Sequence, residues 1–402
     1  MRFEKKYISH AKINLGLSVP FRYQSGYHHI VSLFSPIDFC DEIALSFTMA
    51  SKNSFTLTWE NLLPAGFNSL ENVNTVFEVE YQNNLIYKAF QWMNSFIKES
   101  GIELPCFETR IHIKKRIPSP AGLGGGSSNA ATIIFAMFEF LEASKLMSDK
   151  NTAGKLLHNL KSRCIETGSD IPFFLENLVK PQTALISGTG EVFQAFPGIK
   201  LAGILGIPPF GFSTRIMYES LKRPVFSGNY HDIMAIPDRE NPQSFSKKTL
   251  HDENSLIDNQ YSIHAIHNGY KSLYELLTID DMARDSGSTG ESSSRKPVYK
   301  KENGTYVLDN DFFFISQKVF PDKYEFIRKI KKDAMNEILQ IVRQENIQSK
   351  TLCSMSGSGA TIYVGVTGKE GYSPKIQQKL DFSIISLRKK HADVHWIKFC
   401  TI

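Results

Sequence analysis

Between Pro118 and Ala131 the chain reads PSPAGLGGGSSNAA, which places four glycines within five residues. Glycine has no Cβ, so a cluster this dense suits a backbone that bends sharply or comes very close to another group. The preceding residues 107–114, FETRIHIK, alternate apolar and polar as a half-buried strand does. The following residues carry apolar side chains at helical spacing, at Ile134, Met137, Phe138 and Leu141. The order is therefore strand, glycine loop, helix.

A helix that begins at such a loop offers unpaired N–H groups and the positive end of its dipole, which together favour a phosphate. Ser127 or Ser128 is the expected N-cap of this helix. A Walker A loop requires a lysine after its last glycine, and a dinucleotide fingerprint requires a glycine where Ser127 stands. Both motifs are excluded. A plain strand-to-helix turn would need only one or two glycines, so the loop indicates a phosphate donor such as ATP in some other fold.

Composition limits the class of protein. The chain has 402 residues, 42% of them hydrophobic, enough for a substantial core, and its net charge is only +5. No basic run is long enough to predict nucleic-acid binding, and the longest apolar run, AATIIFAMFEFL, is too short to span a membrane. The five cysteines lie far apart without a CxxC pair. We therefore expect a soluble protein of a reducing compartment, with neither a nucleic acid nor a membrane as its partner.

Other elements can be predicted from periodicity. Residues 152–167 predict a helix closed by Gly168, ALISGTGEVF predicts strand, turn and strand, and YEFIRKIKKDAMNEILQIVRQ predicts an amphipathic helix. SMSGSGATIYVGV predicts a second glycine turn that leads into a buried strand. Residues 223–304 are rich in Ser, Asn, Asp, His and Lys and predict a partly disordered insertion. A tolerated surface insertion is the favoured interpretation, over a regulatory or partner-binding segment.

Several segments together resemble the kinases named for galactose, homoserine, mevalonate and phosphomevalonate, the GHMP kinases. Besides the glycine loop they are SHAKINLGL (9–17), SGYHHI (25–30), TGSDIPFFL (167–175) and SMSGSGATIYV (354–364), with NNLIYKAF, SGTGE and DND in agreement. The resemblance covers about 1–222 and 305–400. It implies an α+β fold with a ribosomal-S5-like α/β domain over 1–195. A ferredoxin-like domain would follow over 196–402, interrupted by the insertion at about 223–304.

Within this family the combination is most similar to kinases whose acceptor is a cytidine-diphosphate sugar alcohol, used in isoprenoid precursor synthesis. The resemblance implies that Asp170 is the general base and that Lys12 contacts both that aspartate and the reacting oxygen. Asn14, on the same strand face as Lys12, would hydrogen-bond the substrate. From the residues alone, Asp170 is equally well a helix N-cap, and a lone strand lysine such as Lys12 is usually a solvated face residue.

The resemblance also implies a cytidine pocket. Tyr27 would stack on the base and His28 would bond its polar edge, the order of the motif selecting His28 over His29. Thr214 and Tyr218 would form the other side of the pocket, with a core tyrosine as the alternative for Tyr218.

ATP would be held mainly by backbone groups of the glycine loop. The residues implied are Pro118, Gly122, Leu123, Gly124, Gly125, Gly126, Ser127, Ser128 and Asn129. Lys115, Asn84 and Leu85 would border the adenine. The segment SMSGSGATIYV (354–364) corresponds to the third motif of the family, and its Gly357, Ser358 and Gly359 would pack against the loop. Transfer from ATP implies Mg²⁺, which needs few protein ligands, and the sequence assigns it none.

Two positions depart from the family pattern: Ser25 stands where an acid is typical, and Ser169 where an alanine is usual. The alternatives are another GHMP kinase, acting on mevalonate, homoserine or a sugar, and a non-catalytic homologue that senses a nucleotide or metabolite. The presence of both Lys12 and Asp170 counts against the sensor. We expect a monomer or homodimer, located in the cytoplasm, or in a plastid or apicoplast stroma if a leader precedes this chain.

Overall fold

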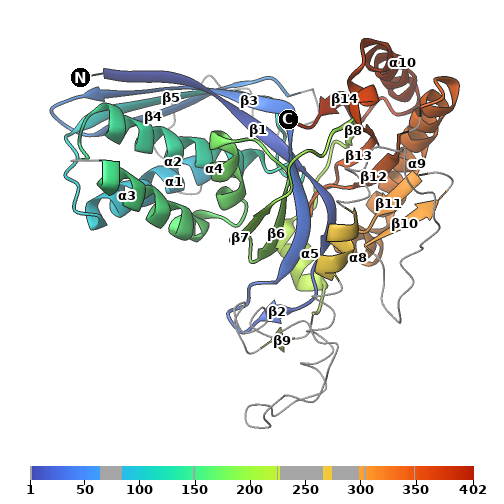
Figure 1. The fold of residues 1–402 in the computed structure, drawn as a ribbon, viewed down its shortest axis with the longest axis horizontal. Helices are drawn as coiled ribbons and strands as arrows, with labels where there is room; N and C mark the ends of the chain where they lie inside the picture. The colour runs from blue at the N-terminus through green and yellow to red at the C-terminus, as the bar shows by residue number, and fades with distance from the viewer. Residues whose placement is uncertain are drawn as a thin grey trace, which may run out of the picture.

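A computed structural model describes residues 2–63, 84–147, 150–223, 225–226, 266–273, 298–302, 305–347 and 349–402. These residues form helices and two large mixed sheets (Figure 1). Within these ranges, every helix is too short or too polar to cross a membrane.

The first sheet is built around one long strand. Its strands are β1 (Arg2–Ser18), β3 (Ile30–Met49), β4 (Ser54–Asn61), β5 (Phe107–Lys115), β6 (Ala184–Gly188) and β7 (Val192–Ala195). β1 pairs antiparallel with β3 along nearly its whole length. The other edge of β3 pairs with β5 in its second half and with β6 in its first half. This sheet carries Lys12 and Asn14 on β1 toward the middle of the molecule.

Helices pack together on one face of this sheet (Figure 1). They are α1 (Leu85–Glu99), α2 (Gly125–Ala143), α3 (Lys150–Arg163), the 3₁₀-helix η2 (Cys164–Thr167) and α4 (Ile171–Val179). α2 is buried almost all round, packing on α1, α4, β1 and β3. A helix apolar on every side is stable only in such a central place. Its N-terminus is therefore held firmly beside β1.

The second sheet has the order β10-β11-β12-β13-β8-β14. Its strands are β8 (Leu201–Ile207), β10 (Tyr299–Glu302), β11 (Thr305–Leu308), β12 (Thr351–Met355), β13 (Ile362–Thr367) and β14 (His395–Cys400). The associated helices are α5 (Thr214–Ser220), α8 (Asp311–Val319), α9 (Pro321–Gln344), η3 (Lys369–Tyr372) and α10 (Pro374–Lys390). A short parallel pair joins β2 (Arg22–Tyr23) to β9 (Val225–Phe226).

The two sheets meet at the end of β1. Leu17 forms a bridge with Asn310, and its N–H donates to the Asp309 carbonyl at 2.9 Å. In β3, Ile37 forms an antiparallel bridge with Thr401. The expected α+β fold with two mixed sheets is confirmed. The division into two domains between residues 195 and 196 stays a prediction. It falls between the end of β7 at Ala195 and the start of β8 at Leu201.

Most element predictions are confirmed, and two details are corrected. β5 buries Phe107, Thr109, Ile111 and Ile113 as its alternation indicates. The helix after the glycine loop begins at Gly125 with Gly124 as N-cap, so neither Ser127 nor Ser128 caps it. The N-cap φ of +72° lies in the left-handed region, which glycine adopts without strain and serine does not. Residues 164–167 form a 3₁₀ turn instead of continuing α3, and Thr167 Oγ1 donates to the Cys164 carbonyl.

Most of the predicted insertion, 223–304, lies outside the described residues, and the prediction of disorder concerns those residues. The described helical residues 266–273 are not a surface appendage, because Tyr270 and Leu273 are completely buried. Tyr270 packs on Gly16 of β1, where a Cβ would come within 2.9 Å of the tyrosine hydroxyl. At the insertion's beginning, Arg223 pairs with Asp311 at 2.7 Å. These parts of the insertion therefore belong to the packed core around the end of β1.

Candidate active site

A lysine and an aspartate from distant segments face each other between β1 and α4. Lys12 Nζ lies 3.6 Å from Asp170 Oδ2, with the lysine side chain 4% exposed and the aspartate 27% exposed. The ammonium also lies 4.2 Å from the centre of the Phe34 ring. Burial lowers the pKa of Lys12, and the negative charge of Asp170 partly opposes that shift. The pair joins a buried cation to a carboxylate that solvent can still reach.

Asp170 occupies the N-cap position of α4, but its side chain makes no capping hydrogen bond. The α4 terminus is arranged instead by Pro172 in its first turn and by backbone bonds such as Ile171 N to Gly168 O at 3.0 Å. A carboxylate in a capping role would accept from the backbone of the first turn. The Asp170 carboxylate is thus directed toward Lys12 and away from its own helix.

Asn14 connects this pair to the third glycine motif. Its Oδ1 accepts from Lys12 Nζ at 2.6 Å, and its Nδ2 donates to Ser32 Oγ at 3.0 Å. Ser356 Oγ donates to the Gly122 carbonyl at 2.9 Å and lies 3.5 Å from Asn14 Oδ1. Because Asn14 is 1% exposed, its polar atoms act mainly within the protein and fix the position of the Lys12 ammonium.

Gly122 and Gly124 of the loop, and Gly359 opposite them, lie where a side chain would collide with the protein itself. A Cβ on Gly122 (φ +78°) would overlap the Ser356 carbonyl, and a Cβ on Gly359 would overlap Ala121. A Cβ on Gly124 would lie 2.7 Å from the Phe174 ring and 3.2 Å from Lys12 Cγ. The loop is therefore packed between the third motif and Lys12, whatever ligand it binds.

Gly125 and Gly126 differ from each other in their surroundings. A Cβ on Gly125 would lie 2.7 Å from Ile117 and 3.0 Å from Lys115 Nζ. A Cβ on Gly126 would meet no described atom closer than Leu85 Cδ2, at 3.9 Å. The open side of the loop is therefore the side of Gly126, at the first turn of α2.

A buried carboxylate outside the set of predicted site residues organises the segment before this loop. Asp41 Oδ1 accepts from the backbone N–H groups of Arg116 at 2.7 Å and Ile117 at 2.9 Å. Asp41 Oδ2 accepts from Lys115 Nζ and, at 3.0 Å, from Asn129 Nδ2. Asp41 is completely buried on β3. It therefore ties the end of β5 to the first turns of α2.

Asp41 could have been found from the pattern of its strand. Positions 41, 43, 45 and 47 of β3 are all buried, and the last three are Ile43, Leu45 and Phe47. Alternation thus places Asp41 on the inward face, where a charge is costly unless it is paired. An acid at an inward strand position is therefore a signal of a buried polar network.

The remaining residues predicted for ATP have partners of their own. Ser9 Oγ lies 2.7 Å from both Ser128 Oγ and Asn129 Oδ1 inside the protein. Asn84 caps α1, accepting from Ile86 N at 2.9 Å. Ser127 and Leu85 are partly buried, while Leu123 and Pro118 are buried. Their contact with ATP stays a prediction. The side chains of Asn84, Ser128 and Asn129 already form hydrogen bonds within the protein.

Tyr27 and His28, two of the residues predicted to hold the nucleoside, lie in the turn after β2. Gly26 (φ +91°) turns the chain, and Tyr27, at 64% exposure, projects from it. The His28 ring lies 4.9 Å from the Tyr218 ring, which in turn meets Phe312 at 4.7 Å. Burial raises the pKa of the Tyr218 hydroxyl, and the charge of Asp170 adds to that rise. Tyr218 therefore connects His28 of this turn with Phe312 of α8.

His29 occupies a different environment from His28. It is completely buried, stacks on Phe21 at 4.8 Å and bonds the Tyr23 hydroxyl through Nδ1 at 2.7 Å. Burial lowers its pKa to about 3, so it stays neutral at physiological pH. Burial and the nearby Arg22 and Arg223 also lower the pKa of the half-buried His28. Thr214, which is predicted for the other side of the nucleoside pocket, has its Oγ1 2.9 Å from Ser358 Oγ of the third motif.

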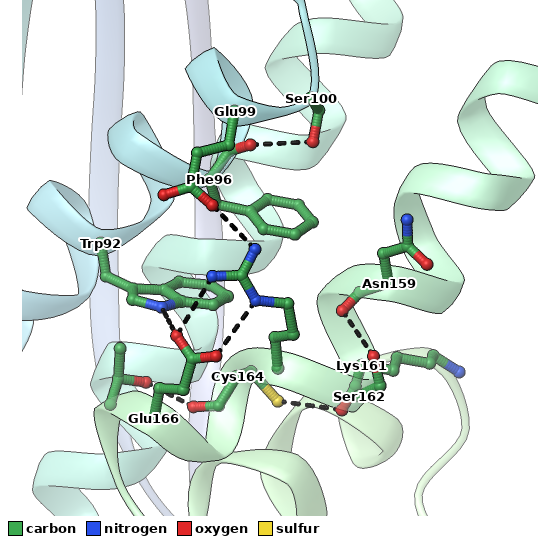
Figure 2. Close-up of polar contacts among 11 residues, drawn as sticks. Trp92, Phe96, Glu99, Ser100, Asn159, Lys161, Ser162, Cys164 and Glu166 are labelled. Atoms are coloured by element: carbon green, nitrogen blue, oxygen red, sulfur yellow. Dashed lines mark hydrogen bonds and ion pairs between the residues drawn. The ribbon is translucent and has the colours of Figure 1, made fainter.

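A polar network anchors the segment that leads to Asp170. Figure 2 shows the Trp92 indole of α1 directed at Glu166 of η2, and Trp92 Nε1 donates to Glu166 Oε2 at 2.9 Å. Arg163 pairs with both Glu166, at 3.0 Å, and Glu99 of α1, at 2.8 Å. These pairs are exposed, so each contributes little on its own. Together they join η2 to α1 shortly before the chain reaches Asp170.

Comparison with known proteins identifies relatives of this chain. Residues 84–177 match the family model described as GHMP kinases N terminal domain. A protein from Leptospira biflexa named 4-diphosphocytidyl-2-C-methyl-D-erythritol kinase is 33% identical over 220 residues, which are 54% of this chain and 64% of that protein. A protein of the same name from Protochlamydia amoebophila is 32% identical over 238 residues, 59% of this chain and 69% of that protein.

The chain thus spans slightly less than two thirds of some of these relatives, 64% for Leptospira biflexa and 65% for Thermosipho melanesiensis. A crystal structure of 4-(cytidine 5'-diphospho)-2C-methyl-D-erythritol kinase aligns over 98% of both chains with a TM-score of 0.50. Its sequence identity of 20% means that this likeness shows a shared fold only. The matched domain and the relative covered over 69% of its length establish the conclusion that this chain belongs to the GHMP kinase family.

Proposed function

We propose that this chain transfers the γ-phosphoryl group of ATP to the 2-hydroxyl of 4-diphosphocytidyl-2-C-methyl-D-erythritol, in the non-mevalonate route to isoprenoid precursors. The observation that carries the proposal is the Lys12–Asp170 pair, 3.6 Å apart, and the packing of Tyr218 on His28 supports the choice of a nucleoside substrate. The names of the relatives support the choice of acceptor.

In the proposed reaction Asp170 accepts the proton of the acceptor hydroxyl as its oxygen attacks the γ-phosphorus. The new O–P bond forms while the bond from that phosphorus to the β–γ bridging oxygen breaks, and ADP leaves. The Lys12 ammonium favours ionised Asp170 and stabilises negative charge on the attacking oxygen. Asn14, which accepts from Lys12 Nζ at 2.6 Å, holds the ammonium in position. A direct hydrogen bond from Asn14 to the substrate would have to use the hydrogen-bonding capacity that its contacts within the protein leave over.

The donor would lie over the open side of the glycine loop. A Cβ at Gly126 would come no closer than 3.9 Å to any described atom, in contrast to one at Gly122, Gly124 or Gly125. Free N–H groups and the dipole at the start of α2 would attract the phosphates there. The cytosine would pack against the exposed Tyr27 with His28 at its polar edge.

Mg²⁺ would enter with the triphosphate. In the described part of the chain, no three His, Cys, Asp or Glu side chains are grouped as a metal site. In the proposal the ion is bound chiefly by phosphate oxygens and water, and its charge would offset that of the triphosphate. The protein's own residues supply the base and the ammonium.

The experiment is a coupled assay of ADP release with a panel of acceptors: 4-diphosphocytidyl-2-C-methyl-D-erythritol, mevalonate, homoserine and galactose. We expect turnover with the first acceptor alone, and a loss of at least about a hundredfold in Asp170→Asn. Turnover with another acceptor would assign a different member of the family. ATP binding without turnover, unchanged in Asp170→Asn, would favour the sensor alternative and refute the proposal.

The acceptor pocket has its own test. Tyr27→Ala removes an exposed ring that contacts the protein little, so the fold should be preserved. The Michaelis constant for the cytidine substrate should rise about tenfold or more, by the loss of one stacking contact, while that for ATP stays unchanged. An unchanged constant for the cytidine substrate would remove Tyr27 from the pocket.

A further inference from the structure

A cavity of about 1070 Å³ opens at the edge of the second sheet, outside the proposed active site. Its walls come from β10, β11, the start of α8, one side of α9 and the end of β12. None of the residues proposed above for catalysis, the acceptor or ATP lines it. The volume is that of a site for a small organic molecule.

The cavity follows from how the helices cover the sheet. α9 packs on β12, β13 and β8, and α10 on β8 and β14. The apolar stripe of α9 that makes this contact is Ile327, Ile330, Ala334, Ile338 and Ile341. The edge strand β10 and its neighbour β11 lie beside the part of the sheet that α9 and α10 cover (Figure 1). There, Lys300 lies directly opposite Val307, so the two side chains are on the same face of the sheet. This is the face that α9 covers, and beside α9 it ends in charged residues.

The charge of the lining is unbalanced. Five cationic side chains line the cavity, against the two carboxylates of Glu302 and Asp309, leaving three net positive charges; the cations are Lys300, Arg328, Lys331, Lys332 and Arg343. Lys300 is paired with Glu302 at 2.5 Å, and Arg328 is paired at 2.8 Å with Glu325 of its own helix, which does not line the cavity. Arg328, Lys331 and Lys332 fall within about 6 Å along the α9 axis, whereas Arg343 lies about 16 Å beyond Lys332. One small anion can therefore contact Arg328, Lys331 and Lys332 together, but not Arg343 as well.

Lys331 is the central member of this cluster. It is partly buried, and its ammonium lies 4.2 Å from the centre of the Phe313 ring. Phe313 in turn packs with Tyr324 at 4.9 Å, so an aromatic pair adjoins the cations. Burial lowers the pKa of Lys331, which marks an ammonium short of solvation. Across the described ranges, neither Lys331 nor Lys332 forms an ion pair with a carboxylate.

We propose that this cavity binds a small organic anion with a planar apolar group. Its phosphate, sulfonate or carboxylate would contact Arg328, Lys331 and Lys332. The planar group would lie on Phe313 and Tyr324, next to the apolar side chains of Met335 and Leu339. This site is independent of the proposed kinase reaction, because it shares none of its residues.

The test uses 8-anilinonaphthalene-1-sulfonate as probe, followed by its fluorescence on binding to the full chain. We expect saturable binding that Lys331→Met weakens about tenfold or more, the loss of one hydrogen bond to a charged group. Lys329→Met is the matched control, because Lys329 is an exposed α9 residue that does not line the cavity. Lys12→Met excludes the proposed active site as the source of the signal. Neither control should change the affinity.

Two further measurements keep the result interpretable. Far-UV circular dichroism verifies that each variant is folded, and Arg328→Met, at a 60% exposed position, replaces Lys331→Met if that variant does not fold. Inorganic pyrophosphate should compete with the probe in the wild type and lose its effect in the cavity variant. Equal affinity of the wild type and the cavity variant would overturn the proposal. So would an equal loss in Lys329→Met, or a loss confined to Lys12→Met.

Discussion

Replacing Lys12 with methionine removes one charge from the proposed active site while keeping a side chain of similar length. The ammonium that is lost lies 3.6 Å from Asp170 Oδ2 and 2.6 Å from Asn14 Oδ1. The thioether would keep the packing against the Phe34 ring, now 4.2 Å from the ammonium. Burying methionine avoids the desolvation of a cation, so the melting temperature should stay close to that of the wild type.

The effect on catalysis can be estimated from the geometry. Two unit charges 3.6 Å apart interact by about 5 kcal/mol at an effective dielectric constant of about 20. This attraction is already present before the reaction and holds the two groups together. The part that acts on kcat is the stabilisation of the negative charge that develops on the attacking oxygen, about 3 kcal/mol for one such donor. That corresponds to a decrease in kcat of about a hundredfold, the size of effect expected for a buried group that stabilises developing charge.

The measurement is kcat and KM from coupled ADP release with the cytidine substrate. Lys6→Met, at an exposed position of the same strand, is the matched control and should leave both constants unchanged. A kcat of Lys12→Met within about threefold of the wild type, in a folded variant, would refute the role of Lys12. A change in the KM for ATP alone would assign Lys12 to donor binding instead.

The wild type should also lose activity at alkaline pH for the same reason. Burial holds the pKa of Lys12 below its ordinary value of 10.5, and only the protonated lysine assists Asp170. As the pH rises through this lowered pKa, kcat should therefore fall before an ordinary lysine would titrate. Lys12→Arg keeps its charge to higher pH, so any activity it retains should lack this alkaline decline. An identical decline in both proteins would assign it to another group.

Further predictions concern groups that hold the site together. Asp41→Asn exchanges an acceptor for a donor in a buried charge network and should lower the free energy of unfolding by about 3–5 kcal/mol, seen as a lower urea midpoint. Gly122→Ala should reduce thermal stability strongly, since its Cβ would overlap the Ser356 carbonyl, whereas Gly126→Ala should change it by no more than about 1 kcal/mol. Tyr270→Ala should destabilise the fold by about 3–5 kcal/mol and raise KM for the cytidine substrate more than KM for ATP, because the ring supports β1 before the nucleoside turn. Unchanged midpoints, or equal effects of the two glycine substitutions, would contradict these assignments.

Local patterns predicted the elements well where the segment itself contains the information. The alternation in 107–114 and the helical spacing after Ala131 correspond to β5 and α2. The N-cap of α2 was wrong because serine is preferred there only when the backbone is extended. Here the close approach of Phe174 and Lys12 to Gly124 imposes a left-handed backbone instead. The competing contacts come from β1 and α4, distant in the chain.

The predicted insertion shows the same limit. Its composition indicates few residues to bury, yet Tyr270 and Leu273 are completely buried beside β1. Composition averages over a segment, whereas burial is decided by single side chains that meet a matching surface. Gly16 supplies that surface, and nothing near residue 16 indicates a tyrosine from residue 270.

By itself the sequence determined the order of strand, glycine loop and helix and the resemblance to a kinase family, which implies the α+β fold, because periodicity and motif spacing are properties of neighbouring residues. Tertiary structure decided which of the named residues meet. It brought Lys12 to Asp170, Asn14 to Ser356 and Tyr218 to His28, and it added Asp41 as the partner of Lys115 and Asn129. Such contacts depend on how β1, α2, α4 and the second sheet pack, and long-range packing leaves only a faint trace in any one segment.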